Sequence, residues 1–402
     1  MKEFSEFQDN YSNTCTPVFF GPLKPQEIGG TPKEPVTADT GAVVLDNGDL
    51  SFRLYYPAAG SVVVEVRSGR HRSAIDLEKD GEGFFTGILP YTGDPNWVGM
   101  REVNVKVDGV DVVSPRLPLI SSLTGFGNYV FIPDTGWDDY LVKKVPHGTL
   151  SYEIYWSEVL NDWQRCMVYT PAEYQKNPDK KYPVLYLHHP GFGNETSWMF
   201  PGKVPMIMDN LLAQGEAVPF IIVTNQCSAK LPSDGRFGMD GYIRILLEDC
   251  IPFIEEKYRV LSDKWNRASA GASWGGMLSS RLVFEHPEHF ASVGMLSSGL
   301  RCVDTHPVLE DNHYLDWMRS NAEEVGRQYK LIFRSHGEIE YTGRPGVPGE
   351  NGNPTLLEDE VFLSENGIDQ LPCYSRVVFP GYKHMWETFS RGFSLFAREL
   401  FR

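Results

Sequence analysis

The pattern of hydrophobic and polar residues divides the chain into two parts that differ in periodicity. Between residues 41 and 114, segments such as Leu50–Tyr55 and Ser61–Arg67 alternate polar and apolar residues, and turn signals such as Asn47-Gly48 separate them. Strands with one buried face have this period of two. Because these strands follow one another about ten residues apart, with no helical segment between them, residues 41–115 are predicted to form an immunoglobulin-like β-sandwich.

From residue 147 onward, apolar runs alternate with amphipathic segments. The strand candidates are Arg165–Thr170, Tyr182–His188, Pro219–Thr224, Asn266–Ala270, Ala291–Leu296, Lys330–Arg334 and Ser375–Phe379. Helices are predicted over Gly275–Glu285 and Trp386–Phe401, the latter with an apolar face. Buried strands that alternate with helices form a mostly parallel sheet covered on both faces. Residues 147–402 are therefore predicted to form a three-layer α/β sandwich.

Two segments fit neither pattern. Residues 1–40 are polar and rich in proline, which predicts an extended N-terminal arm. Residues 116–146 show little periodicity and are predicted to be a linker between the two domains.

Composition and charge narrow the range of partners. The 402 residues carry a net charge of −16, which disfavours nucleic acid and anionic membranes. The six cysteines have no metal-ligand spacing, so we expect reduced thiols, no metal and no cofactor. No apolar run is long enough to span a membrane. The first residues form no apolar h-region, and we therefore expect no signal peptide and a cytoplasmic location.

The segment Gly271-Ala272-Ser273-Trp274-Gly275 reads Gly-x-Ser-x-Gly, between a predicted strand and a predicted helix. On such a sharp turn a serine hydroxyl is exposed above the sheet, and the glycines let strand and helix pass closely. The pattern alone also occurs by chance in tight turns. Its context between strand and helix favours Ser273 as a nucleophile.

A serine nucleophile needs a base and an orienting acid. In α/β-hydrolases the chain order is serine, acid, histidine. His384 follows the last predicted strand and is the favoured base, whereas His336 is the alternative. Glu340 and Glu338 both follow the strand before it, and either carboxylate could orient His384. The ordinary alternative for each is a solvated loop acid.

An oxyanion hole needs two backbone N–H groups. Trp274, the residue after the nucleophile, is expected to supply one, and Gly191 in the loop His188–Gly193 is expected to supply the other. Phe192, Trp198 and Trp386 are candidates for substrate-binding aromatic side chains, although any one such residue is more often part of the core.

With these residues located, the chain from Val145 to its end resembles the feruloyl and acetyl xylan esterases of carbohydrate esterase family 1, whose relatives include esterase D and enterochelin esterase. The resemblance is carried by Met167–Pro171, Tyr182–Leu187, the serine motif and His384 with Trp386. It implies an α/β-hydrolase fold. The family's Gly-x-x-Asp falls on Gly337–Glu340, which favours Glu340 over Glu338 as the acid.

Residues 41–114 resemble the early-set, glycogen-binding-like modules that precede such esterases, through Asp46–Leu54 and Val107–Val110. This likeness implies a carbohydrate-binding module. Three departures from the esterase pattern are Pro190 after His189, Trp274 in place of methionine, and Glu340 in place of aspartate. The bulky Trp274 and Phe192 are expected to reshape the acyl pocket.

The sequence therefore predicts a serine esterase that releases feruloyl or acetyl groups from oligosaccharides derived from plant cell walls. The expected partner is a small ester or an esterified oligosaccharide, and a homo-oligomer remains open. Two alternatives remain: a siderophore trilactone esterase of the enterochelin type, and a non-catalytic carbohydrate-binding protein with a degenerate hydrolase domain.

Overall fold

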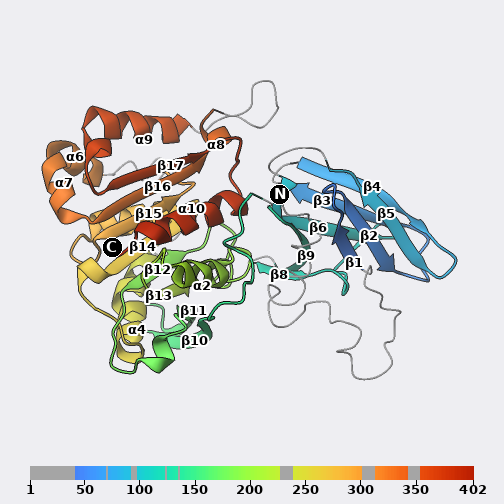
Figure 1. The fold of residues 1–402 in the computed structure, drawn as a ribbon, viewed down its shortest axis with the longest axis horizontal. Helices are drawn as coiled ribbons and strands as arrows, with labels where there is room; N and C mark the ends of the chain where they lie inside the picture. Colours follow the sequence, from blue (N-terminus) through green and yellow to red (C-terminus); the bar gives the residue numbers. More distant parts are fainter. Residues whose placement is uncertain are drawn as a thin grey trace. The chain divides into compact units, whose positions relative to one another are not determined.

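The computed structural model describes residues 41–68, 71–91, 97–122, 125–134, 136–226, 239–300, 313–342 and 354–402. The predicted arm over residues 1–40 lies outside this range. The chain separates into two compact units, Met1–Lys143 and Lys144–Arg402 (Figure 1), and each is described by itself.

The first unit is built from β-strands in its described part. They are β1 (Gly41–Val44), β2 (Leu50–Tyr55), β3 (Val62–Ser68), β4 (His71–Lys79), β5 (Phe84–Leu89), β6 (Gly99–Val107), β7 (Val110–Val112), β8 (Leu119–Ser122) and β9 (Gly125–Ile132). Neighbouring strands pair in the order β1-β2-β5-β4-β3-β6-β9-β8, with β7 on β6. Strand β4 pairs with β3 over residues 71–77 and with β5 at Glu78 and Lys79, so it passes from one sheet to the other.

Alternating residues of both sheets bury a single apolar core. Phe52 and Leu54 of β2 face inward in the same cluster as Val64 of β3 and Val105 of β6. The predicted alternation is confirmed, since β2 alternates buried and half-buried positions from end to end. The immunoglobulin-like fold class predicted for this unit is confirmed.

The segment predicted as a linker, residues 116–146, is partly structured. Strands β8 and β9 lie within it and pair with each other and with β6. Leu117 and Ile132 belong to the core of the first unit. The buried Asn128 side chain accepts from Ser114 N at 2.7 Å and donates to Ser114 O at 2.9 Å. The module therefore extends past residue 115, and Gly125 and Gly127 conceal the strand in the sequence.

The second unit contains β10 (Thr149–Ser157), β11 (Asp162–Thr170), β12 (Val184–His188), β13 (Ile221–Asn225), β14 (Arg267–Ala272), β15 (Ser292–Leu296), β16 (Leu331–Gly337) and β17 (Tyr374–Phe379). Their order is β10-β11-β13-β12-β14-β15-β16-β17. Strands β10 and β11 run antiparallel at one edge, and the others are parallel. Every predicted strand is present, and β10 is an addition.

Helices cover both faces of this sheet. They are α2 (Val204–Gln214), α3 (Met239–Arg244), the π-helical η4 (Ile245–Cys250), α4 (Ile251–Lys257), α5 (Trp274–Glu285), α6 (His313–Ser320), α7 (Ala322–Gln328), α8 (Glu338–Thr342), α9 (Pro354–Glu365) and α10 (Trp386–Glu399), with 3-10 turns η3 (Tyr174–Lys176), η5 (Lys264–Asn266) and η6 (Ile368–Gln370). Helices α2 and α10 pack together on one face (Figure 1). The main core on the other face joins α3, η4, α4, α5, α6, α7 and α9 to the strands. This is the predicted three-layer α/β sandwich.

Two further expectations concern the described residues. Cys166, Cys250 and Cys373 are buried free thiols, as expected; the remaining three cysteines lie outside the described range. Within the described ranges, no helix has the length and apolar character needed to cross a bilayer.

Candidate active site

Ser273 lies between β14 and α5, at the carboxyl edge of the parallel strands. Its backbone has φ 54° and ψ −120°, a conformation that non-glycine residues rarely adopt. The Ser273 N–H donates to Leu296 O of the neighbouring β15 at 3.0 Å, and the Ser273 carbonyl accepts from Gly276 N as the helix begins. Strain of this kind costs about 1–3 kcal/mol and is concentrated at functional sites.

The glycines of the motif are required by the close crossing of two backbones. A Cβ on Gly271 would lie 2.4 Å from the carbonyl group of Gly275, and a Cβ on Gly275 would lie 2.4 Å from His188 O. A Cβ on Gly276 would lie 2.4 Å from the Ser298 Cβ. A side chain on Gly275 would push α5 away from β12, one on Gly271 would push it away from β14, and one on Gly276 would push it away from Ser298. The glycines therefore fix the turn that exposes Ser273.

His384 lies against Ser273 although the two residues are 111 positions apart in the chain. Its Nε2 is 2.8 Å from Ser273 Oγ, and its Nδ1 is 2.7 Å from Glu340 Oε2. The imidazole packs edge-on against Phe389 of α10, and its side chain is 49% exposed. Two hydrogen bonds therefore join Ser273, His384 and Glu340, with the imidazole between hydroxyl and carboxylate. We call these three side chains the relay.

The Glu340 carboxylate is almost fully buried and is held on its other oxygen. Its Oε1 accepts from Ser297 Oγ at 2.7 Å and from Gly337 N at 2.7 Å. Glu338, the alternative acid, instead accepts from Gly381 N at 2.9 Å in the turn before His384. The structure thus brings Glu340, and not Glu338, to the imidazole.

The turn that carries His384 is tied to the end of β16. A Cβ on Gly337 would lie 2.2 Å from Tyr382 O, and Ile339 N donates to that same carbonyl at 3.1 Å. Because β16 delivers Glu340 and the turn after β17 delivers His384, this contact sets the distance between acid and base.

The two residues expected to form the oxyanion hole are neighbours. A Cβ on Gly191 would lie 4.0 Å from the Trp274 Cβ. Gly193 N donates to Pro190 O at 3.0 Å and closes a tight turn, in which Phe192 has φ 65°. Phe192 is 80% exposed. The structure therefore holds an unshielded aromatic side chain, in a strained conformation, next to the serine turn.

Three other histidines lie in the core of this unit. Burial lowers the pKa of His188 to about 3 and that of His189 to about 4. His188 Nε2 lies 3.0 Å from Ser269 Oγ, and its Nδ1 lies 3.1 Å from Tyr242 OH. Burial, followed by the Arg334 and Arg376 charges, also holds the pKa of His336 well below its usual value. His336, the alternative base, is fully buried.

The prediction of a substrate contact is wrong for Trp198. Its side chain is fully buried, its Nε1 donates to His188 O at 2.7 Å, and its ring meets Trp386 edge-on at 5.3 Å. Trp198 instead supports the backbone at the end of β12, where the loop that carries Gly191 begins. Trp386 is half-buried, and Phe192 is the exposed member of the three.

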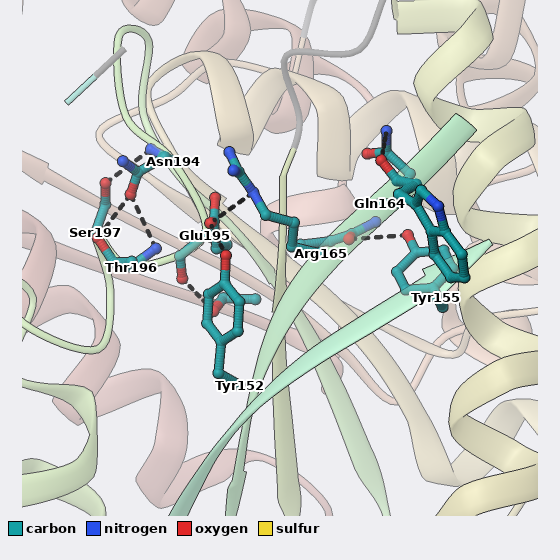
Figure 2. Close-up of polar contacts among 11 residues, drawn as sticks. Tyr152, Tyr155, Gln164, Arg165, Asn194, Glu195, Thr196 and Ser197 are labelled. Atoms are coloured by element: carbon teal, nitrogen blue, oxygen red, sulfur yellow. Dashed lines mark hydrogen bonds and ion pairs between the residues drawn. The ribbon is translucent and has the colours of Figure 1, made fainter. Parts of the chain in front are cut away.

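Sequence reasoning missed two groups of residues at this edge of the sheet. Ser297, with φ 50°, donates to the Glu340 carboxylate; its position directly after a strand was the available signal. Glu195, in the loop after β12, pairs with Arg165 and Tyr152 of the edge strands (Figure 2).

Metal chemistry was not expected. Among the residues that the structure describes, no group of three or more His, Cys, Asp or Glu side chains could hold a metal ion.

A strained serine at a strand-to-helix turn, a histidine after the last strand and an acid after the strand before it define an α/β-hydrolase domain. Residues 157–371 match the family described as putative esterase. The chain belongs to this family.

Several known proteins are similar to this chain, including the following three. One is the "endo-1,4-beta-xylanase/feruloyl esterase" of Xylanibacter ruminicola, 35% identical over 266 residues, which are 64% of this chain and 36% of the relative. This chain thus spans about a third of that relative's length. A solved "ferulic acid esterase" structure is 25% identical, with a TM-score of 0.52, over 64% of this chain and 98% of its own. The Shigella flexneri enterochelin esterase structure, 14% identical with a TM-score of 0.58, shares the fold over 90% of this chain and 95% of its own.

Proposed function

We propose that the protein is a serine carboxylic-ester hydrolase that releases hydroxycinnamoyl or acetyl groups from oligosaccharides derived from plant cell walls. The observation that carries the proposal is the relay of Ser273, His384 and Glu340, with donor–acceptor distances of 2.8 and 2.7 Å. Both fall in the range required for proton transfer.

In the proposed reaction, Ser273 Oγ attacks the ester carbonyl carbon while His384 Nε2 takes the hydroxyl proton. The Gly191 and Trp274 N–H groups stabilise the oxyanion that forms. The carbon–oxygen bond to the sugar breaks, and His384 returns the proton to the leaving hydroxyl. Water then attacks the acyl-enzyme with His384 as base, and the free acid leaves. Glu340 keeps the Nδ1 proton in place throughout.

The substrate class rests on the relatives. The proteins at 35% and 25% identity are described as feruloyl or ferulic acid esterases, and the first is also described as a xylanase. A ferulic acid ester is the common element of these descriptions. The exposed Phe192 beside the serine turn would contact an aromatic acyl group directly.

The test is a panel of methyl ferulate, acetylated xylo-oligosaccharides and 4-nitrophenyl acetate, assayed with wild type and Ser273→Ala. We expect turnover by the wild type and a loss of at least about a thousandfold in the variant. Labelling of Ser273 by a fluorophosphonate checks the nucleophile separately. Inactivity on every ester, with no adduct, would favour the non-catalytic carbohydrate-binding alternative.

A second candidate function follows from the similarity that spans both units. The enterochelin esterase fold covers 90% of this chain, whereas the ferulic acid esterase covers 64%. Adding enterobactin to the panel separates the two: hydrolysis of this trilactone at a higher kcat/KM than methyl ferulate would replace the first proposal. A cytoplasmic location remains a prediction, and cell fractionation tests it.

A further inference from the structure

The edge hairpin of the second unit carries a row of exposed aromatic and aliphatic side chains. We call it the hairpin face; it consists of Tyr152, Ile154, Trp156, Trp163 and Arg165. The first three are alternate residues of β10, and Trp156 and Ile154 pair with Trp163 and Arg165 of β11. Tyr152, Ile154, Trp156 and Trp163 are 50%, 57%, 41% and 61% exposed. The Trp156 and Trp163 rings meet edge-on at 5.4 Å.

The same face of the sheet is covered further along β11. Met167 and Tyr169 share this face and are buried, and Tyr169 OH donates to Asp209 of α2 at 2.6 Å. Helix α2 thus packs on one half of β11, while the hairpin face beyond it is solvent-exposed. Contiguous exposed apolar patches of this kind mark binding surfaces.

The hairpin face lies at the same edge of the sheet as the candidate active site. The last residue of β13, Asn225, pairs with Cys166, so Arg165 and Trp163 extend past the carboxyl end of that parallel strand. Ser273 follows another parallel strand at this same edge. The loop after β12 contains both Gly191 and Glu195, and Glu195 reaches the hairpin face.

The hairpin face also carries a charged hydrogen-bond donor, Arg165, which is positioned by a buried carboxylate. Glu195 Oε1 lies 3.0 Å from Arg165 Nε and accepts from Tyr152 OH at 3.2 Å (Figure 2). Glu195 is only 3% exposed, and its Oε2 is buried with no hydrogen-bond partner in the described chain. The buried Glu195 carboxylate thus holds in place the Arg165 side chain, which is 49% exposed on the hairpin face.

We propose that the hairpin face binds the neutral sugar chain of the substrate. Pyranose rings stack on Trp156 and Trp163, and sugar hydroxyl oxygens accept hydrogen bonds from the half-exposed Arg165 guanidinium. The charges of Arg165 and Glu195 cancel, which suits an uncharged ligand, and the net charge of −16 opposes a second copy of the chain. From Tyr152 to Trp156 the strand spans roughly 13 Å, which exceeds the length of a single sugar ring. That the bound sugar belongs to the ester substrate rests on the proposed function.

The test begins with binding, because binding does not depend on catalysis. Unesterified xylohexaose is titrated calorimetrically into wild type, Trp156→Ala, Trp163→Ala and Trp163→Tyr. We expect Kd to rise about five- to tenfold for each alanine variant and to stay within about twofold for the tyrosine variant, which keeps a ring. Trp265→Ala is the matched control: Trp265 is 40% exposed but lies in η5, just before the start of β14. It should not change Kd.

Kinetics then connect binding to the reaction. Trp156→Ala and Trp163→Ala should leave kcat/KM for methyl ferulate unchanged and raise KM for a feruloylated xylo-oligosaccharide about five- to tenfold. Absence of xylohexaose binding by the wild type, or equal Kd in the alanine variants, overturns the proposal. The proposal is also overturned if sedimentation shows that the wild type is a dimer and Trp163→Ala is a monomer, because the hairpin face would then be an interface between two copies of the protein. If the wild type hydrolyses none of the esters, the proposed function is refuted. The proposed sugar binding is not refuted by that result, because the xylohexaose titrations do not depend on catalysis.

Discussion

Replacing Glu340 by glutamine tests the proposed relay most directly, because the surroundings of the carboxylate dictate how an amide must sit. Glu340 Oε1 accepts from Gly337 N, a backbone donor that cannot turn away, and from Ser297 Oγ. In Glu340→Gln the amide oxygen must keep this position. The amide NH₂ group then occupies the place of Oε2 and points at His384 Nδ1.

The consequence is a change of tautomer. A donor facing Nδ1 forces the imidazole proton onto Nε2, where it points at Ser273 Oγ, and the base can no longer accept the hydroxyl proton. The same exchange in a Ser-His-Asp triad lowers kcat about 10⁴-fold, or roughly 5.4 kcal/mol of transition-state stabilisation. We expect a loss of this order here, with little change in KM.

The assay is the steady-state hydrolysis of methyl ferulate and 4-nitrophenyl acetate, accompanied by thermal unfolding to verify folding. Glu338→Gln is the matched control, since Glu338 contacts Gly381 N and not the imidazole; its kcat should stay within about threefold. His384→Ala combined with Glu340→Gln should be no slower than His384→Ala alone, since residues that act as a unit are non-additive. Activity of Glu340→Gln within tenfold of wild type, or a greater loss in Glu338→Gln, would refute the reasoning.

Three further outcomes are expected. Ser297→Gly keeps the φ of 50° and removes the hydroxyl that donates to Glu340; kcat should fall about ten- to a hundredfold at unchanged KM, since a bond to a charged group is worth about 1.5–3 kcal/mol. Gly275→Ala places a Cβ 2.4 Å from His188 O and should lower Tm by many degrees or prevent folding, whereas Gly81→Ala, with open space around it, should change Tm little. Stability should also fall on acidification: His188 and His189 have folded-state pKa values of about 3 and 4, below the unfolded value, so the unfolded chain binds protons first. Each should remove roughly 2 kcal/mol between pH 7 and pH 5, measurable by urea unfolding; a stability that stays level over that range would contradict it.

The sequence predicts the strands of the second unit well because their burial on both faces makes them continuous apolar runs. Strand β10 was not predicted. It lies at the sheet edge, where polar residues alternate with exposed aromatic and aliphatic side chains. It therefore contains no continuous apolar run that would mark it as a strand. Strands β8 and β9 were hidden in the predicted linker for a related reason, since Gly125 and Gly127 remove side chains that would reveal the period.

The sequence predicts those parts of the site that depend on a local motif or on the order of residues along the chain. The spacing of the serine motif, and the positions of His384 and Glu340 after successive strands, are visible in one dimension. The burial of Trp198 depends on its contact with Trp386, which is distant in the chain. The role of Ser297 depends on its positive φ angle. The residue type does not predict this angle, because serine is common at strand ends.

The crossing of α5 over β12 has a consequence for how this protein could acquire new specificity. With glycine wherever the two backbones meet, the nucleophile and the loop after β12 form one rigid block that tolerates no added bulk. Variation in substrate choice is thereby directed to solvent-facing positions such as Phe192 and the edge strands, where a new side chain alters recognition while the reacting groups keep their alignment.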